Sequence, residues 1–299
     1  MKKLFIINFL LITLQSVVLA QNANRSNEQS VIIIVIDGVR YSETFGSGSK
    51  NISHLYNDLA PLGTVYTNFR IADEGITSTN PGQASILTGT WQLIANDGTE
   101  HPNKPTVFEY YRKEFSAKES DCIIIAGKKK LEVLAYSSFP EFGQDYKAST
   151  SCFDAKTNNE VYDSLVASLN NYHPRLLLVN FPITDKKAHA KNWEEYLAAI
   201  RNVDSLIYLL YGKIQSDPFY KNKTTLLITN DHGRHTNDFS NHGDDCDGCE
   251  HIMLLAVGEI FKGNKFDADL HYQIDICKTI REIMKFQTPF ANGNSLIKN

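Results

Sequence analysis

The sequence predicts an α/β fold with three layers, in which a mostly parallel, doubly wound sheet lies between two layers of helices. Five runs of aliphatic residues are continuously apolar, which is typical of strands that are buried on both faces. These runs span residues 31–36, 122–126, 176–181, 225–229 and 253–257. Between them lie segments with helical spacing, most clearly at 161–172, 193–214 and 274–284. Strands and helices that alternate in this way build a layered sheet.

The composition is that of an ordinary globular protein, with 299 residues of which 42% are hydrophobic and 21% are charged. No repeat, low-complexity block or linker divides residues 31–299, so we expect a single domain there. The formal net charge of -4 gives no electrostatic support to a protein that coats nucleic acid. A nucleic-acid partner is therefore not expected.

The N-terminus has the features of a secretory signal. Two lysines precede an apolar run at residues 4–14, and small residues suited to cleavage follow at 18–20. The apolar run is short for a membrane span, although an uncleaved anchor is the alternative. We expect residues 1–20 to be removed and residues 21–30 to form a polar tether. The mature chain would then be exported, periplasmic or secreted, without a stable membrane anchor.

The five cysteines are too few for a scaffold built on disulfides, and their odd number leaves at least one unpaired within the chain. Cys246 and Cys249 form one CxxC motif, which by itself does not specify one chemistry. In an exported protein we expect a short disulfide between them that braces the neighbouring loop. A metal clip and a redox-exchange motif are the alternatives.

Three aspartates follow buried strands, namely Asp37, Asp185 and Asp231. Open α/β sheets bind their ligands beyond the carboxyl ends of the strands, so we expect these side chains to meet at one edge. Carboxylates crowded into a dry cleft raise one another's pKa. Two bound cations would remove that conflict.

Three histidines accompany the aspartates. His232 follows Asp231 directly, His189 lies four residues after Asp185, and His242 lies in the loop at 230–248. Carboxylate oxygens and neutral imidazoles together suit divalent metals. We therefore expect two divalent ions, with zinc as the best fit and manganese or iron as alternatives.

The stretch at residues 75–89 carries a hydroxyl group in a turn, at Thr79. Pro81 and Gly82 suit the first turn of a helix, and residues 83–88 continue it as a short helix. Thr79 would then lie at a helix N-terminus, where unpaired N–H groups and the helix dipole favour an anion. A threonine in this position is usually only a cap, but the expected metal ligands make a nucleophile the alternative.

Taken together, these motifs resemble those of the alkaline phosphatase superfamily. The resemblance is closest to the nucleotide pyrophosphatase/phosphodiesterase branch and related secreted metalloenzymes. The matching segments follow the family's order and lie at residues 35–38, 79–89, 185–189, 230–233 and 242–245. The resemblance implies an alkaline phosphatase-like catalytic domain over residues 31–299 that acts as a phosphatase or phosphodiesterase on a small phosphorylated substrate.

The resemblance also implies which residues bind metal. They fall into two groups, one of Asp185, His189 and His242, and the other of Asp37, Asp231, His232 and the Thr79 oxygen. The implied mechanism has two steps, in which the activated Thr79 hydroxyl attacks phosphorus and water then hydrolyses the phosphothreonine.

Three further residues are candidates for holding the phosphate. Related enzymes place an asparagine after the nucleophile helix, and Asn96 and Asn103 are the candidates for that position. Arg234 could clamp a phosphate oxygen with two hydrogen bonds, although a solvated surface arginine is the alternative.

Other activities are alternatives to hydrolysis of phosphate esters. The frame around Thr79 resembles the sulfatase signature, but threonine cannot become formylglycine because its β-carbon carries a methyl group. A metal-dependent phosphomutase is a second alternative, although the family's phosphoglycerate mutases have serine at this position. A non-catalytic metal-binding or substrate-binding relative is the third.

Overall fold

The computed structural model describes residues 28–297, so the expected signal peptide at 1–20 lies outside the described residues, as does most of the expected tether. The strands are β1 (Ser30–Ile36), β2 (Gly63–Arg70), β3 (Cys122–Ala126), β4 (Ser149–Cys152), β5 (Leu176–Phe181), β6 (Thr224–Thr229), β7 (His251–Val257), β8 (Lys265–Asp267) and β9 (His271–Tyr272). They form one sheet in the order β4-β3-β5-β1-β6-β7-β2-β8, with β9 beside β2. All five predicted strands are present.

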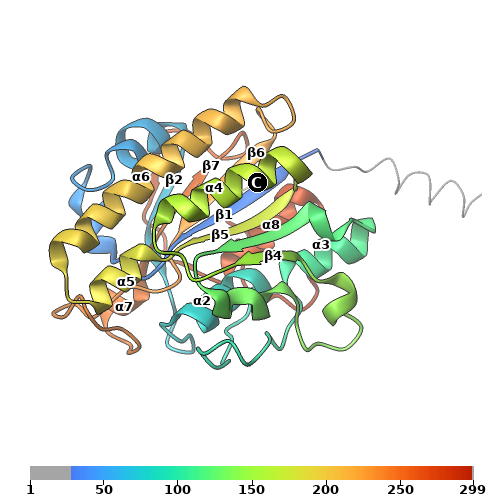
Figure 1. Ribbon diagram of the computed structural model, residues 1–299, viewed down its shortest axis with the longest axis horizontal. Helices are drawn as coiled ribbons and strands as arrows, with labels where there is room; N and C mark the ends of the chain where they lie inside the picture. The colour runs from blue at the N-terminus through green and yellow to red at the C-terminus, as the bar shows by residue number, and fades with distance from the viewer. Residues whose placement is uncertain (1–27, 298–299) are drawn as a thin grey trace, which may run out of the picture.

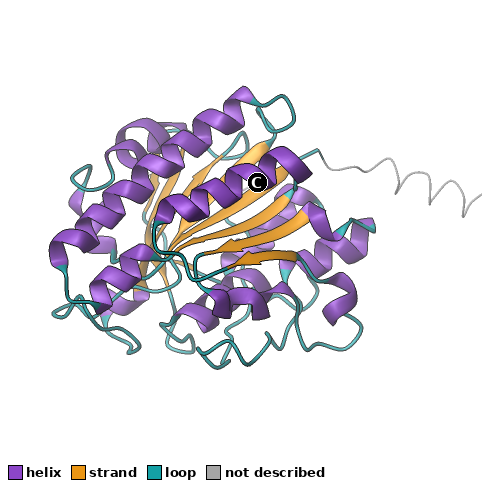
Figure 2. Ribbon diagram, viewed as in Figure 1, coloured by secondary structure: helices purple, strands orange, loops and turns teal. Residues whose placement is uncertain are grey.

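The helices are α2 (Thr79–Thr88), α3 (Val107–Phe115), α4 (Asn158–Tyr172), α5 (Ile183–His189), α6 (Trp193–Ser216), α7 (Asp247–Glu250) and α8 (Asp275–Met284). They cover both sides of the sheet, with α4 and α6 in front of it in the view of Figure 1. Figure 2 shows the strands enclosed between the helices. The predicted three-layer α/β fold is confirmed.

The centre of the sheet is parallel. β1 pairs in parallel with β5 on one side and with β6 on the other, and β3 continues the parallel part beyond β5. β7 reverses the direction, because it pairs antiparallel with both β6 and β2. The carboxyl ends of β1, β5 and β6 therefore lie at the same edge.

β1 is buried on both faces, as its unbroken apolar run predicts. Ile33 and Val35 belong to a hydrophobic cluster with residues of α2, α3 and α8, whereas Ile32 and Ile34 belong to a second cluster with residues of α4 and α6. Side chains alternate between the two faces of a strand, so each face of β1 carries its own core. β1 ends at Ile36, immediately before the buried side chain of Asp37.

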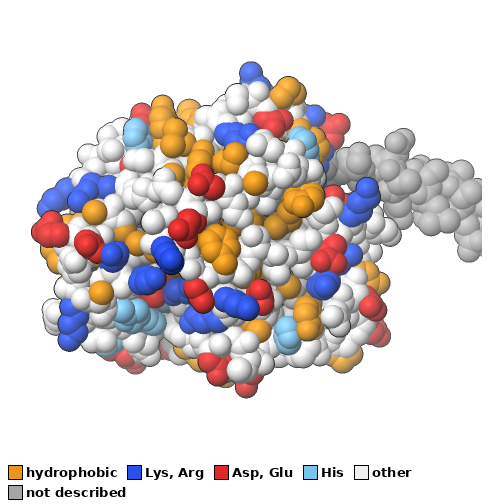
Figure 3. Space-filling model, viewed as in Figure 1, with side chains coloured by type: hydrophobic (Ala, Val, Ile, Leu, Met, Phe, Trp, Pro, Cys, Tyr) orange, Lys and Arg blue, Asp and Glu red, His pale blue; other side chains and the backbone are white. Residues whose placement is uncertain are grey.

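None of the helices within residues 28–297 is long and apolar enough to cross a membrane. On the face shown in Figure 3, acidic and basic side chains are interspersed, and basic side chains do not form a separate patch.

Candidate metal centre and nucleophile

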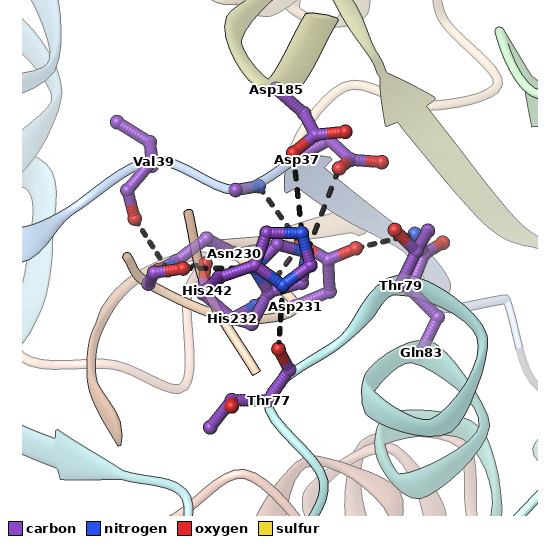
Figure 4. Close-up of polar contacts among 12 residues, drawn as sticks. Asp37, Val39, Thr77, Thr79, Gln83, Asp185, Asn230, Asp231, His232 and His242 are labelled. Carbon is purple, nitrogen blue, oxygen red and sulfur yellow. Dashed lines mark hydrogen bonds and ion pairs between the residues drawn. The ribbon is translucent and has the colours of Figure 1, made fainter. Parts of the chain in front are cut away.

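The three predicted aspartates meet at the carboxyl edge of the sheet (Figure 4). Asp37 directly follows β1, Asp231 lies two residues beyond β6, and Asp185 lies on α5 just after β5. All three are buried. Burial, followed by the charge of Asp231, raises the pKa of Asp37 to about 6, and burial also raises the pKa of Asp231. The site therefore concentrates negative charge that a cation would stabilise.

Asp37, Asp231 and His232 form what we call the inner group. The Nε2 atom of His232 lies 3.9 Å from Asp37 Oδ1 and 3.8 Å from Asp231 Oδ1. Its Nδ1 atom lies 2.9 Å from the Gly233 carbonyl oxygen. Because a carbonyl only accepts hydrogen bonds, Nδ1 carries the proton and Nε2 keeps a lone pair.

This Nε2 atom is buried and has no hydrogen-bond partner among the described residues. Burial lowers the pKa of His232 to about 4, so the ring is neutral at neutral pH. A neutral imidazole whose other nitrogen is held by a carbonyl is the usual arrangement of a metal-binding histidine. The inner group therefore fits a divalent ion.

Asp185, His189 and His242 form the outer group. The four-residue spacing on α5 places Asp185 and His189 on one helix face. His189 Nε2 lies 3.2 Å from Asp185 Oδ1 and 3.2 Å from His242 Nε2, and His242 Nε2 lies 3.8 Å from Asp185 Oδ1. Zinc–ligand bonds are about 2.0–2.2 Å long, so ligand atoms at these separations fit around one ion.

His242 is oriented in the same way as His232. Its Nδ1 atom lies 2.9 Å from the Thr77 carbonyl oxygen, which leaves Nε2 to face the outer group. Burial lowers the pKa of His242 to about 3. The two rings stack with their centroids 3.9 Å apart, so the inner and outer groups are adjacent.

Lys128 joins the two groups, and the sequence reasoning missed it. Its Nζ atom donates to Asp37 Oδ1 at 2.8 Å, to Asp185 Oδ2 at 2.7 Å and to Thr79 Oγ1 at 3.1 Å. Burial opposes its charge, but Asp37 and then Asp185 outweigh burial and raise the pKa of Lys128 above its usual value. Lys128 lies just beyond β3, so the rule that located the aspartates also applies to it.

Thr79 is the first residue of α2, as its surroundings in the sequence predict, and it is buried. The contact with Lys128 shows that its hydroxyl faces the carboxylates. The position of Thr79 at the start of α2 also places its hydroxyl beside backbone N–H groups that have no partner within the helix. The structure thus brings the predicted nucleophile to the predicted ligands.

Two residues of α2 connect the helix to the inner group. Gln83 Nε2 donates to Asp231 Oδ2 at 2.9 Å. Gly82 packs so closely on residue 231 that a β-carbon would overlap the Asp231 carbonyl oxygen. The glycine in the Thr79 turn is therefore required for contact with the inner group.

Arg234 is fully buried, which excludes a solvated surface arginine. Its Nε atom donates to the Gly38 carbonyl at 2.8 Å, and its Nη2 atom donates to the Asp185 carboxylate. Gly38 has φ +60°, and a β-carbon there would lie 2.8 Å from Asp185 Oδ1. In this structure Arg234 holds a predicted metal ligand, while its buried Nη1 atom has no partner among the described residues.

The two candidate asparagines differ in position. Asn96 Oδ1 accepts from the Asn80 backbone N–H and from Lys130 Nζ, both at 2.9 Å, so it lies beside the start of α2. Asn103 exchanges two hydrogen bonds with Gln92. Asn96 therefore lies next to the predicted nucleophile. Asn103 lies beyond the end of α2, where its side chain and backbone hydrogen-bond to Gln92.

All five cysteines are free in the structure, including Cys246 and Cys249, for which a disulfide was the expectation. Cys246 is the residue that caps the N-terminus of α7 and Cys249 lies within that helix, with the Cys249 N–H donating to the Cys246 carbonyl at 2.8 Å.

Comparison with known proteins gives one family and one fold. The model of the Metalloenzyme superfamily matches residues 143–246. This segment includes all of the outer group, together with Asp231 and His232. No curated protein matches the chain in sequence.

Three solved structures illustrate the fold. Phosphonate monoester hydrolase from Silicibacter pomeroyi has a TM-score of 0.68 at 14% identity, over 90% of this chain and 76% of that one. An alkaline phosphatase superfamily protein from Vibrio parahaemolyticus has a TM-score of 0.63 at 13% identity, over 91% and 70% of the two chains. This is the alkaline phosphatase fold. A sulfatase from Pseudoalteromonas sp. shares it, with a TM-score of 0.61 at 13% identity over 89% and 69%.

The resemblance to the alkaline phosphatase superfamily is confirmed at the level of the fold, and residues 143–246 match the model of the Metalloenzyme superfamily. The superfamily contains metal-dependent hydrolases, and the grouped carboxylates and imidazoles agree with use of a divalent metal. The closer resemblance to the phosphodiesterase branch stays a prediction.

Proposed function

We propose that this chain is an exported, metal-dependent hydrolase of phosphate esters that uses Thr79 as its nucleophile. The observation that carries the proposal is the contact between Thr79 Oγ1 and Lys128 Nζ, at 3.1 Å. The same ammonium group contacts one aspartate of each group, Asp37 and Asp185. This shared contact supports a role for the buried Thr79 hydroxyl beside the candidate metal positions.

The inner and outer groups would each hold one divalent ion, with zinc the best fit to their imidazoles and carboxylates. When bound, the ions would lower the pKa of the Thr79 hydroxyl and offset negative charge on the phosphoryl oxygens. Lone pairs on His232 Nε2 and His242 Nε2 are already directed to these positions, since both Nδ1 atoms are held by carbonyl groups.

The chain's own residues would perform the remaining tasks. The Thr79 oxygen attacks phosphorus, the ester bond to the alcohol breaks, and phosphothreonine forms at residue 79. Water then hydrolyses this ester, which releases phosphate and restores the hydroxyl group. Lys128 and the positive end of the α2 dipole stabilise the charge on the phosphoryl oxygens in both steps.

Lys128 supports phosphate monoesters as the preferred substrates. A monoester carries up to two negative charges at neutral pH and a diester carries one, so a cation beside the nucleophile favours the monoester. Sulfate esters are disfavoured because Thr79 cannot be converted to formylglycine. The phosphonate monoester hydrolase and the sulfatase share the fold of this chain, but the chemistry proposed here depends on Thr79.

The test uses purified protein supplied with zinc and assayed on p-nitrophenyl phosphate, bis-p-nitrophenyl phosphate and p-nitrophenyl sulfate. We expect the highest kcat/KM with the phosphate monoester and no hydrolysis of the sulfate ester. Acid quenching during turnover should trap phosphate on the peptide that contains Thr79. Hydrolysis of p-nitrophenyl sulfate alone would reject the proposal, and bound zinc without any hydrolysis would favour a non-catalytic binding protein.

Thr79→Ala separates chemistry from folding. We expect this variant to keep its zinc content and melting temperature while losing turnover by at least about 10³-fold. Thr79→Ser is the matched control, because it keeps a hydroxyl group at the same position and should retain activity. Near wild-type rates in Thr79→Ala would remove Thr79 from the mechanism.

Export is a separate part of the proposal and rests on residues 1–20. Expression of the full chain in a bacterium should yield a periplasmic or secreted product that begins near Gln21. A cytoplasmic product that keeps Met1 would contradict export without affecting the proposed chemistry.

A further inference from the structure

Three side chains with metal-binding atoms, those of His235, Asp244 and Cys249, meet outside the candidate metal centre, with Cys246 beside them. They lie at the base of the loop formed by residues 236–245, which we call the His242 loop. His235 Nε2 lies 3.2 Å from Asp244 Oδ2. His235, Asp244 and Cys249 each place one ligand atom within 4.8 Å of the others. The Cys246 N–H donates to Asp244 Oδ1 at 3.2 Å, so Cys246 also lies beside this carboxylate.

The backbone holds this cluster in place. The turn at the start of α7 brings the two cysteines together, with the Cys249 N–H donating to the Cys246 carbonyl at 2.8 Å. The same turn is paired with the segment that leaves β6, because the Gly233 N–H donates to the Cys249 carbonyl at 2.8 Å. A β-carbon on Gly233 would overlap the Gly248 carbonyl oxygen, so the two segments pack as closely as glycine allows.

The cluster therefore lies where the His242 loop begins and ends. His235 immediately precedes the loop, and Asp244 lies near its end. Between them the loop carries His242, whose Nδ1 atom contacts the Thr77 carbonyl two residues before the proposed nucleophile. A bound ion that links His235 to Asp244 and the cysteines would therefore also close the base of the loop that positions His242.

We propose that His235, Asp244, Cys246 and Cys249 bind a structural zinc ion that is separate from the metals of the candidate centre. Two cysteines with one histidine and one further ligand make up the usual fourfold set of a structural zinc site. Thiolate ligands select zinc over calcium or magnesium. As thiolates, the two cysteines would add negative charge beside Asp244, and a divalent cation offsets that charge.

A disulfide between Cys246 and Cys249 is the competing arrangement. It would use the two sulfur atoms alone and would assign no role to the convergence of His235 and Asp244 on them. The zinc site accounts for all four side chains.

Cobalt distinguishes this site from the candidate metal centre, because cobalt bound by thiolate has a charge-transfer band in the near ultraviolet and the centre contains no sulfur ligand. We expect the cobalt-loaded protein to show the band. Cys249→Ser should abolish it, and His235→Ala should weaken cobalt retention against a chelator by about 10-fold or more. Asp231→Asn in the inner group and Cys152→Ser in β4 are matched controls that should keep the band.

Zinc content and thiol counts complete the test. Elemental analysis should find one zinc ion fewer per chain in Cys249→Ser than in Cys152→Ser. Wild-type protein denatured without reductant should titrate for all five thiols. Only three titratable thiols with a Cys246–Cys249 cross-link, or a cobalt–thiolate band that survives in Cys249→Ser, would overturn the proposal. Because His235→Ala changes a partly exposed side chain, it keeps the test valid if Cys249→Ser does not fold.

Discussion

Gln83 donates its side-chain amide to Asp231 Oδ2 at 2.9 Å, across 148 positions of the chain. This bond connects the helix that begins with Thr79 to a predicted ligand of the inner group. The other oxygen, Asp231 Oδ1, accepts from the backbone N–H groups of Gly38 and His232, so the carboxylate is held at both oxygens and Gln83 fixes the orientation of Oδ2. Gln83 is therefore a positioning residue.

Gln83→Leu should weaken zinc binding at the inner group. Residues that orient a metal ligand typically contribute about 10- to 100-fold in affinity or activity when they are lost. Competition with a chromogenic chelator measures the affinity, and circular dichroism checks the fold. Unchanged zinc affinity in a folded variant would show that Asp231 needs no such orientation.

Lys128→Met should destabilise the protein most when divalent ions are removed. The variant leaves Asp37 and Asp185 without their shared ammonium partner, and breaking a buried ion pair costs about 3 kcal/mol or more. Denaturant unfolding with chelator present measures this loss, and added zinc should reduce it because the ions offset the same carboxylates. Lys130→Met is the control, since its ammonium group contacts Asn96, and we expect a change of about 1 kcal/mol or less.

Gly82→Ala should lower both stability and activity. The new methyl group would overlap the Asp231 carbonyl oxygen, which is backbone and cannot rotate away, and overpacking of this kind costs about 1–3 kcal/mol. Gly212→Ala in α6 is the matched control, because a β-carbon there meets no atom within 4 Å. That substitution should stabilise the protein by about 0.5–1 kcal/mol. Thermal unfolding of both variants tests whether the two substitutions change the stability in opposite directions.

Chelation should lower the melting temperature of the wild type. A ligand that binds the folded state at 100 times its Kd stabilises it by about 2.7 kcal/mol. Scanning calorimetry with a chelator and then with added zinc measures the shift and its recovery. The shift should be smaller in Asp231→Asn, and an equal shift in that variant would place the stabilising ion outside the inner group.

The buried strands could be predicted because each is an unbroken apolar run, as in β1. β2 was missed because its sequence, Gly63–Arg70, mixes polar and apolar residues and only part of it is fully buried. β8 and β9 are too short, at three and two residues, to give a periodic pattern. Long, doubly buried elements thus have a signal in the sequence, and short edge elements do not.

The candidate site shows the same division. Asp37, Asp185 and Asp231 could be placed together because each follows a central strand. Lys128 also follows a strand, but an ammonium group is not a metal ligand, so its residue type did not indicate a place among the carboxylates and imidazoles. The contact of Arg234 with Asp185 depends on α5 and on the approach allowed by Gly38, and neither is visible in the spacing of residues.

The histidines differ in their access to water, since the side chain of His189 is 47% exposed and that of His232 is fully buried. If each group holds an ion, the two ions will exchange at different speeds. Rapid mixing with a chelator should therefore release the metals of the inner and outer groups in separate kinetic phases, the faster one from beside His189. Activity should then decay in the earliest phase that removes an ion required by the reaction.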